Sequence, residues 1–330
     1  MKVDIFPERY NWEDFMRAIK DPSLFVEEFD RLSKNIPQQI RFYLNHGSGV
    51  NIMKQDWDYL LILDACRYDI FRETSRLDGE LKHIISKGSH SKEFCNANFS
   101  GKNFNDTVYV TANGYGARIA QNVFHDLIFT DEDDTIPDTD VLHSTAKGMA
   151  PSTVYDAAID AKEKYPNKRI IVHFMQPHNP FLGSKAQEIR ENLEQSGLVI
   201  RSCNAKKVKK YDIHDDLVMR TLIDAAEEGY ISKAELREVY VENLEIVLKY
   251  IEDLISELPG RTVVTADHGN YLGEQDQFGH PKYEYVEELR KVPYLVVDSG
   301  ERPEIIKEES GETRIDDEMI EQRLKDLGYK

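Results

Sequence analysis

Three residues with metal-binding side chains stand where two apolar segments end. An apolar, β-branched run over 263–266 is followed at once by Asp267 and His268, and a second apolar run over 59–63 ends in Asp64. Both runs predict buried strands, and loops at strand ends are where α/β enzymes place their chemistry. Carboxylate oxygens beside an imidazole nitrogen suit a divalent metal better than a packing role. The two strand ends, about 200 positions apart, therefore predict one metal site.

Several further strands must position these ends. The expected strands, all short and rich in β-branched or aromatic residues, are 59–63, 108–112, 169–174, 262–266 and 293–297. Helical patterns separate them, and strands alternating with helices indicate a parallel arrangement. The sequence therefore predicts an α/β fold with a mostly parallel central sheet and helices on both faces.

Helices are expected between these strands. One begins near Asp69, and a second covers 152–165 with a polar start. A third follows Ser232, which forms a capping box with Glu235, and apolar residues recur behind it at helical spacing. Asn-Gly at 113–114 predicts a turn.

The pattern divides the chain into three regions. Residues 1–55 are expected to form a polar helical extension packed on the core, and 56–300 to form the α/β domain. Within the domain, 183–230 loses the regular pattern and indicates an insertion over the strand ends, as a lid, an interface or only a solvated charged surface. Residues 301–330 are expected to form an acidic tail.

Composition excludes some classes of function. At 330 residues the chain can bury a large core. Its net charge of −18 argues against general nucleic-acid binding, because phosphate backbones attract clustered Lys and Arg. An anionic small substrate stays compatible with this charge, since a metal and one or two local cations can reverse the field inside a cleft.

Cysteine usage and hydropathy bear on the cellular compartment. The three cysteines, Cys66, Cys95 and Cys203, show no paired spacing, which fits a reducing compartment. The N-terminal residues lack the apolar core of a signal peptide, and no stretch reaches about 18 apolar residues. We therefore expect a cytoplasmic protein without a transmembrane segment, with peripheral membrane attachment left open.

The motifs that follow one another along the chain resemble a known family. In chain order they are Ile62-Leu-Asp64-x-x-Arg67-x-Asp69, Pro177-His178-Asn-Pro180, Asp267-His268-Gly269 with Leu272-Gly-Glu274, and Gly279-His280-Pro-Lys282 followed by 287–293. Between about residue 58 and residue 298 they resemble the sulfatase branch of the alkaline phosphatase superfamily. The resemblance implies an alkaline phosphatase/sulfatase-like fold and a metal held by Asp64, Asp267 and His268.

The resemblance also implies a nucleophile that contacts this metal at the start of a helix. The matching segment is 86–94, where Ser91 is the first candidate and Ser89 the second. Metal coordination favours the alkoxide of a serine, and a helix N-terminus supports negative charge. The plainer alternative is that Ser91 only caps a helix.

The segment after Ser91 departs from true sulfatases. Those enzymes convert a Cys or Ser to formylglycine within a motif containing Pro and Arg, and Ser91-Lys-Glu-Phe-Cys95 has neither. An unmodified hydroxyl matches better the family members that transfer phosphoryl or substituted phosphoryl groups.

Other residues are assigned roles toward the substrate. His178 and His280 are expected to bind non-bridging oxygens or protonate the leaving group, although they could hold a second zinc weakly. Lys282 can neutralise a phosphate oxygen or lie at the surface. Arg67 either braces the site through Asp69 or touches the substrate, and we favour bracing.

The sequence thus predicts a metal-dependent hydrolase or transferase of a phosphate ester, mono- or diester, with Ser91 as nucleophile. The expected cofactor is a divalent ion, Zn or Mn before Ca or Mg. The expected partner is a small-molecule or carbohydrate phosphate or sulfate ester, with oligomerisation left open. One alternative is a sulfatase, and another is a catalytically inactive, family-like binding protein.

Overall fold

The structure is a computed structural model. It describes residues 36–130, 148–200, 218–219, 221–308 and 315–326. Most of the expected N-terminal extension, the middle of the expected insertion and parts of the expected acidic tail lie outside the described residues. The limits of the three regions therefore stay predictions.

A seven-stranded sheet forms the centre of the described chain, in the order β2-β11-β8-β1-β5-β3-β4. Its strands are β1 (Tyr59–Asp64), β2 (Glu80–Ile85), β3 (Phe104–Thr111), β4 (Phe124–Phe129), β5 (Arg169–Pro177), β8 (Gly260–Ala266) and β11 (Lys291–Ser299). Neighbours pair in parallel except at β11, which runs antiparallel to both β8 and β2. The prediction of a mostly parallel sheet is confirmed.

Helices connect and cover these strands. They are α3 (Tyr68–Thr74), α4 (Ser91–Asn98), α5 (Gly114–Ala120), α7 (Pro151–Lys164), α8 (Ser184–Gln195), α9 (Leu222–Glu227), α10 (Lys233–Glu257), α11 (Glu287–Arg290) and α12 (Asp317–Asp326), with 3-10 turns η1 (Ile52–Lys54) and η4 (Glu274–Asp276). Residues 36–46 form a further helix. Two strand pairs stand apart from the sheet: β6 (Val199–Ile200) with β7 (Val218–Met219), and β9 (Tyr271–Leu272) with β10 (Phe278–Gly279).

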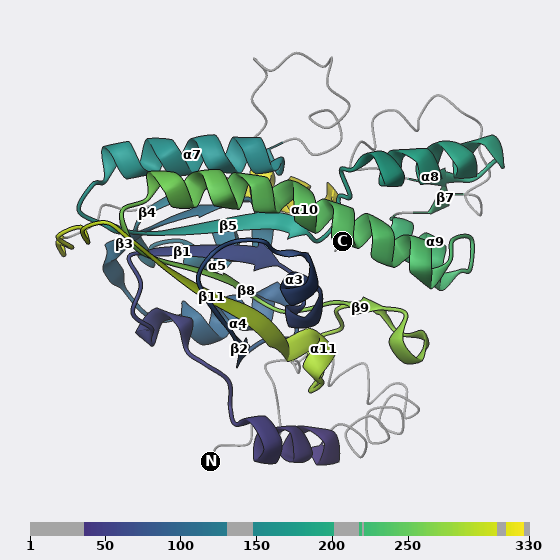
Figure 1. Cartoon of the computed structure of the whole chain (residues 1–330), viewed down its shortest axis with the longest axis horizontal. Coiled ribbons are helices and arrows are strands. Elements are labelled where there is room, and N and C mark those ends of the chain that lie inside the picture. Colours follow the sequence, from purple (N-terminus) through teal and green to yellow (C-terminus); the bar gives the residue numbers. More distant parts are fainter. Residues whose placement is uncertain (1–35, 131–147, 201–217, 220, 309–314, 327–330) are drawn as a thin grey trace.

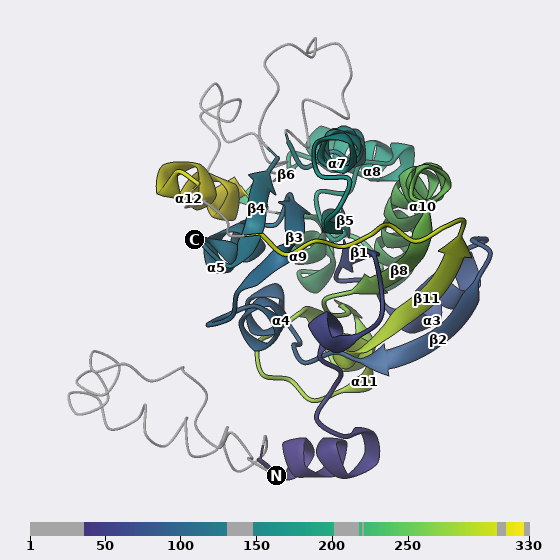
Figure 2. The same ribbon diagram turned by 90° about the vertical axis from the view of Figure 1, so that its left-hand side faces the viewer.

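Both faces of the sheet bury apolar side chains under helices. Leu61 and Leu63 of β1 belong to the core that α7 and α10 cover, whereas Leu60 and Ile62 belong to the core that α4 and α5 cover. Figure 2 shows these two helix pairs on opposite sides of the sheet. Burial on both faces explains why the sequence of β1 is continuously apolar instead of alternating.

Local sequence signals fix where the helices begin. Ser232 and Glu235 form the predicted capping box at the start of α10. The dipeptide at 113–114 differs from its prediction, because Asn113 caps α5 with its side chain and Gly114 is the first helical residue. The asparagine oxygen accepts a hydrogen bond from the amide of Gly116, which is the role of an N-cap and not of a turn.

The helix α12 packs beside α5, as Figure 2 shows. Ile320 and Leu324 are fully buried against Ala117 of α5. The buried guanidinium of Arg323 donates hydrogen bonds to the carbonyls of Ala112 (3.0 Å) and Thr130 (2.8 Å), where β3 and β4 end. The helix α12 therefore supports the strand ends on this side of the sheet.

We expect Leu324→Ala to lower the free energy of unfolding by about 2–4 kcal/mol, because it leaves a cavity between α12 and α5. Urea unfolding followed by circular dichroism measures the change. The exposed Lys325 on the same helix provides the control, and Lys325→Ala should change stability by less than about 0.5 kcal/mol. Equal effects of the two substitutions would show that α12 does not pack as described.

Candidate metal and ester site

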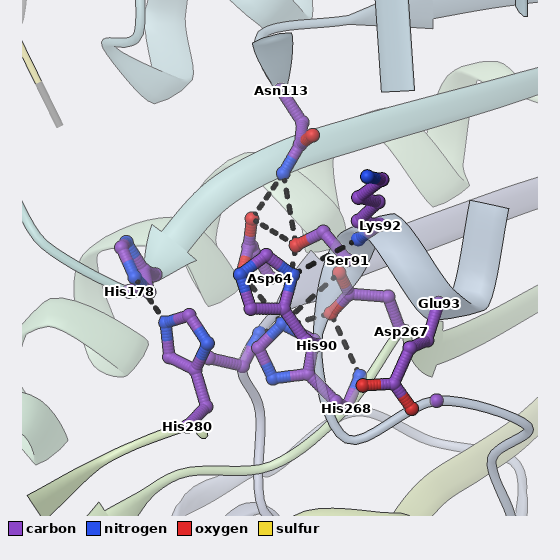
Figure 3. Close-up of polar contacts among 12 residues, drawn as sticks. Asp64, His90, Ser91, Lys92, Glu93, Asn113, His178, Asp267, His268 and His280 are labelled. Carbon is purple, nitrogen blue, oxygen red and sulfur yellow. Dashed lines mark hydrogen bonds and ion pairs between the residues drawn. The ribbon is translucent and has the colours of Figure 1, made fainter. Parts of the chain in front are cut away.

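Side chains from four neighbouring strand ends and one helix start converge at one edge of the sheet. Asp64 ends β1, Asp267 follows β8, His178 follows β5 and Asn113 follows β3. Ser91 begins α4 and lies among them (Figure 3). These five residues are buried. They meet because β5, β1 and β8 are adjacent and parallel, so their carboxyl ends share one edge.

The three residues predicted to hold a metal lie together. One ligand atom from each of Asp64, Asp267 and His268 lies within 4.8 Å of the others. The Nε2 atom of His268 is 3.5 Å from Oδ1 of Asp64 and 3.4 Å from Oδ2 of Asp267. Its Nδ1 lies 2.8 Å from the carbonyl of Gly269, so Nδ1 carries the proton and Nε2 presents a lone pair.

Two buried carboxylate oxygens fit the chemistry of a cation. Oδ1 of Asp64 and Oδ2 of Asp267 have no hydrogen-bond partner within the described part of the chain. Buried carboxylate oxygens of this kind are costly unless they are paired or coordinate a metal. Both face Nε2 of His268, so the donor set fits a divalent ion.

The electrostatics of the two carboxylates agree with this fit. Burial, and then the neighbouring charge of Asp267, raises the pKa of Asp64 well above its usual value. A hydrogen bond from Nδ2 of Asn113 (2.6 Å) favours the charged form of Asp64 but does not offset these effects. The site therefore holds more negative charge than its own hydrogen bonds stabilise.

The surrounding backbone holds the Asp267-His268-Gly269 segment in its conformation. Oδ1 of Asp267 accepts hydrogen bonds from the amides of Ala65 (3.1 Å) and His268 (2.8 Å). These bonds orient the carboxylate so that Oδ2 faces Nε2 of His268. Gly269 lies against the next segment, and a Cβ there would stand 2.0 Å from the carbonyl oxygen of Glu288. Only glycine permits that approach.

The hydroxyl of Ser91 lies beside this group. Its Oγ is 3.1 Å from Nε2 of His268 and 3.4 Å from Oδ2 of Asp64. Nδ2 of Asn113 donates to both Oδ2 of Asp64 and Oγ of Ser91, the latter at 3.2 Å. Asn113 therefore fixes the carboxylate and the hydroxyl relative to each other, a role that sequence reading missed because it took this residue for a turn.

Two further histidines predicted for the site lie face to face. Nε2 of His178 is 2.8 Å from Nε2 of His280. Nδ1 of His178 lies 2.8 Å from the carbonyl of Asn179 and donates to it, so in this pair His280 is the donor. Burial lowers the pKa of His178 to about 4 and lowers that of His280 well below its usual range. Both imidazoles are neutral at pH 7.

A fourth imidazole was missed by sequence reading. His90 is buried, and its Nδ1 accepts the amide of Lys92 (3.0 Å), which caps α4. Its ring stacks on His268 at 6.0 Å and meets His280 edge-on at 5.0 Å. Its position directly before Ser91 was the only sequence signal for this role.

The remaining predicted residues surround this centre. Arg67 pairs with Asp69 (2.7 Å) and with Glu274, and donates to the carbonyl of Asn270 (3.3 Å). These contacts suit a bracing residue, and the role of Arg67 toward a substrate stays a prediction. Lys282 is exposed and lies 5.7 Å above the ring of Tyr115, at the rim.

The second serine candidate has other contacts. The buried hydroxyl of Ser89 donates to the carbonyl of Pro281 (3.0 Å) and accepts the amide of Glu284 (3.1 Å). These contacts join the loop before α4 to the loop that carries His280. We therefore propose that Ser89 supports the two loops.

We expect Asp64→Asn to stabilise the metal-free protein by about 2 kcal/mol at pH 8, because it removes a buried carboxylate beside Asp267. The folded state binds the proton of Asp64 more tightly than the unfolded chain, whose pKa is near 3.8. The wild type therefore loses stability as pH rises above that value, and the gain of the variant shrinks as pH falls toward it.

Thermal unfolding in EDTA across this pH range measures the effect, with the exposed Asp253→Asn as control. A metal-free Asp64→Asn protein that is less stable than wild type at pH 8 would contradict this electrostatic account.

No protein-family model and no curated protein matches the chain. Solved structures do match it. They include the lipooligosaccharide phosphoethanolamine transferase EptA from Neisseria meningitidis (14% identity, 73% of this chain, 47% of that chain, TM-score 0.44) and the C-terminal periplasmic domain of EptC from Campylobacter jejuni (12%, 72%, 78%, 0.42). A putative sulfatase from Bacteroides thetaiotaomicron also matches (10%, 76%, 65%, 0.43). The chain spans about half the length of EptA.

The comparison also bears on location. The matching phosphoethanolamine transferase structures include periplasmic domains from Campylobacter jejuni and Escherichia coli, so our expectation of a cytoplasmic protein is wrong and is withdrawn. In the described part of the chain, no helix has both the length and the apolar character to cross a bilayer. The matching transferases and sulfatases belong to the alkaline phosphatase superfamily, which is the family that the sequence motifs resemble. The likeness of this chain to these structures is one of fold.

Proposed function

We propose that this protein is a metal-dependent enzyme that transfers or hydrolyses the phosphoryl group of a phosphate ester through Ser91. The observation that supports this most directly is the position of Ser91 Oγ, 3.1 Å from Nε2 of His268, the atom that the two unpartnered carboxylate oxygens also face. A serine that only capped α4 would have no need of such neighbours. The cap of that helix is in any case supplied by His90.

The divalent ion would be held by Asp64, Asp267, His268 and Ser91. This donor set favours Zn or Mn. When bound, such an ion lowers the pKa of a coordinated hydroxyl and neutralises charge on a phosphoryl oxygen. One of the similar structures, the periplasmic domain of EptC from Escherichia coli, is a complex with Zn. The identity of the ion in this protein is part of the proposal.

The reaction would proceed as two displacements at phosphorus. Oγ of Ser91 attacks, an Oγ–P bond forms, and the bond from phosphorus to the leaving oxygen breaks. In net terms, the hydroxyl proton of Ser91 ends on the leaving oxygen. The oxygen of water or of an acceptor hydroxyl then forms a new bond to phosphorus as the Oγ–P bond breaks, and its proton returns to Oγ of Ser91. The start of α4 favours the negative charge that Ser91 Oγ develops, because helix N-termini carry partial positive charge.

Neutral donors and one cation would stabilise the phosphoryl oxygens. Asn113 Nδ2 already points at Ser91 Oγ, and His178 and His280 face the same space (Figure 3). Because its pKa is lowered, His280 is neutral at pH 7 and its Nε2 proton is the one available to a phosphoryl oxygen. His178 keeps its own proton on the carbonyl of Asn179 and positions His280, and the positive charge at the rim comes from Lys282. Such an arrangement suits an oxyanion whose charge increases in the transition state.

Hydrolysis of chromogenic aryl esters tests the proposal. A phosphodiester, a phosphomonoester and a sulfate are compared side by side with Zn, with Mn and after chelation. We expect metal-dependent turnover of a phosphate ester. Turnover of the sulfate alone would instead favour a sulfatase, and activity unaffected by chelation would remove the metal from the mechanism.

We expect Ser91→Ala to lower kcat by at least about 1000-fold, because the covalent step needs this oxygen. Mass spectrometry of the quenched wild type should find the added phosphoryl group on the peptide that contains Ser91. Ser89→Ala, which removes the other candidate, should retain the labelled peptide. Labelling that disappears in Ser89→Ala and persists in Ser91→Ala would reverse the assignment.

A further inference from the structure

The longest helix in the described part of the chain carries two polar side chains on its buried face. The helix α10 crosses the sheet beside β5 and passes α3 (Figure 1). Most of its buried residues are apolar, yet Tyr240 and Asn243 are fully buried as well, one turn apart. Burying a hydroxyl and a carboxamide is unfavourable unless both find hydrogen-bond partners. Their partners all lie in the two loops that carry the candidate site.

Tyr240 holds the turn that follows Asp64. Its hydroxyl donates to the carbonyl of Ala65 (2.6 Å) and accepts the amide of Arg67 (3.1 Å). Ala65 has φ +59°, a left-handed conformation that is disfavoured for any residue with a Cβ. On the other side of the turn, the amide of Ala65 donates to Oδ1 of Asp267. The strained residue is therefore held from both sides.

Asn243 holds the loop that carries His178. Its Nδ2 lies 3.0 Å from the carbonyl of His178 and 3.2 Å from those of Pro177 and Pro180, and its Oδ1 accepts the amide of Leu182 (3.0 Å). Prolines have no amide proton, so this loop has few backbone donors of its own. One side chain supplies the hydrogen bonds that the loop lacks.

From these contacts we propose that Tyr240 and Asn243 are positioning residues for two separate parts of the site. Tyr240 sets the direction of the Asp64 carboxylate, and Asn243 sets the position of the His178 imidazole. Because they stand one turn apart on a rigid helix, α10 fixes the spacing between the metal-binding group and the histidine pair. This inference rests on the proposed function and adds residues to it that touch neither metal nor substrate.

The two residues should affect different quantities. Tyr240→Phe keeps the ring and removes the hydroxyl, so the turn at Ala65 can relax. We expect the dissociation constant for Zn, measured by chelator competition, to rise about 10-fold. We also expect faster hydrogen exchange at the amide of Arg67. At saturating Zn, kcat should change less than about 3-fold, because Tyr240 makes no hydrogen bond to the loops that carry His178 and His280.

Asn243→Ala should show the opposite pattern. It removes the contacts to the carbonyl of His178 and leaves Asp64 alone. We expect kcat/KM for the aryl phosphate ester to fall at least about 10-fold at saturating Zn, with the Zn dissociation constant within about 3-fold of wild type. If this variant does not fold, Asn243→Asp, which keeps an acceptor for Leu182 and loses the amide protons, must give the same pattern.

Val247→Ala is the control, since Val247 is buried on the same helix and contacts neither loop by a hydrogen bond. It should lower the melting temperature while leaving Zn affinity and kcat/KM unchanged. The inference is overturned if Tyr240→Phe and Asn243→Ala change the Zn dissociation constant and kcat/KM only in proportion to their loss of stability, as a destabilised fold would. A wild type that binds no Zn defeats the proposed function, whereas a Zn-binding wild type matched in affinity by Tyr240→Phe defeats this inference alone.

Discussion

Two carboxylates buried side by side are the constraint on which this site depends. Asp64 and Asp267 receive hydrogen bonds on one oxygen each, from Asn113 and from two backbone amides, and the other oxygens converge on His268. In the described structure, the ion pairs of both carboxylates are with imidazoles and not with Lys or Arg. This pairing leaves the negative charge poorly compensated, which is why we propose that the site takes up a cation and, beside it, an anionic ester.

The order of the strands turns this local constraint into a site. Because β1 lies between β5 and β8, the loops after these three strands meet at one edge of the sheet. The amide of His178 donates to the carbonyl of Asp64 (3.2 Å), so the loop after β5 adjoins the metal-binding group directly. Helix α4 brings Ser91 from the opposite face, and α10 supports both loops from behind. Each face of the sheet thus contributes to one cluster.

Sequence reading recovered the parts of this structure that local patterns encode. The strands β1, β5 and β8 were predictable because burial on both faces makes their central residues mostly apolar or β-branched, and the convergence of Asp64 with Asp267 followed from their strand ends. The edge strand β2 was missed because half of its residues are polar and exposed, which interrupts the apolar pattern.

Roles that arise only from tertiary contacts were not readable. Asn113 gave a turn signal, Tyr240 matched the helical apolar spacing, and His90 had no pattern of its own. Each acquires its role from a partner more than 20 residues away, His268 in the case of His90. No periodicity or spacing records such pairings.

The separation of β1 and β8 along the chain has a consequence for folding. Their ends come together only after the central sheet has formed, so the denatured chain offers no comparable chelate. A cation bound there is then a ligand of the native state alone. Each tenfold increase of the free cation concentration above its dissociation constant raises the free energy of unfolding by about 1.4 kcal/mol. The same chemistry that serves turnover would thus guard the protein against unfolding and proteolysis.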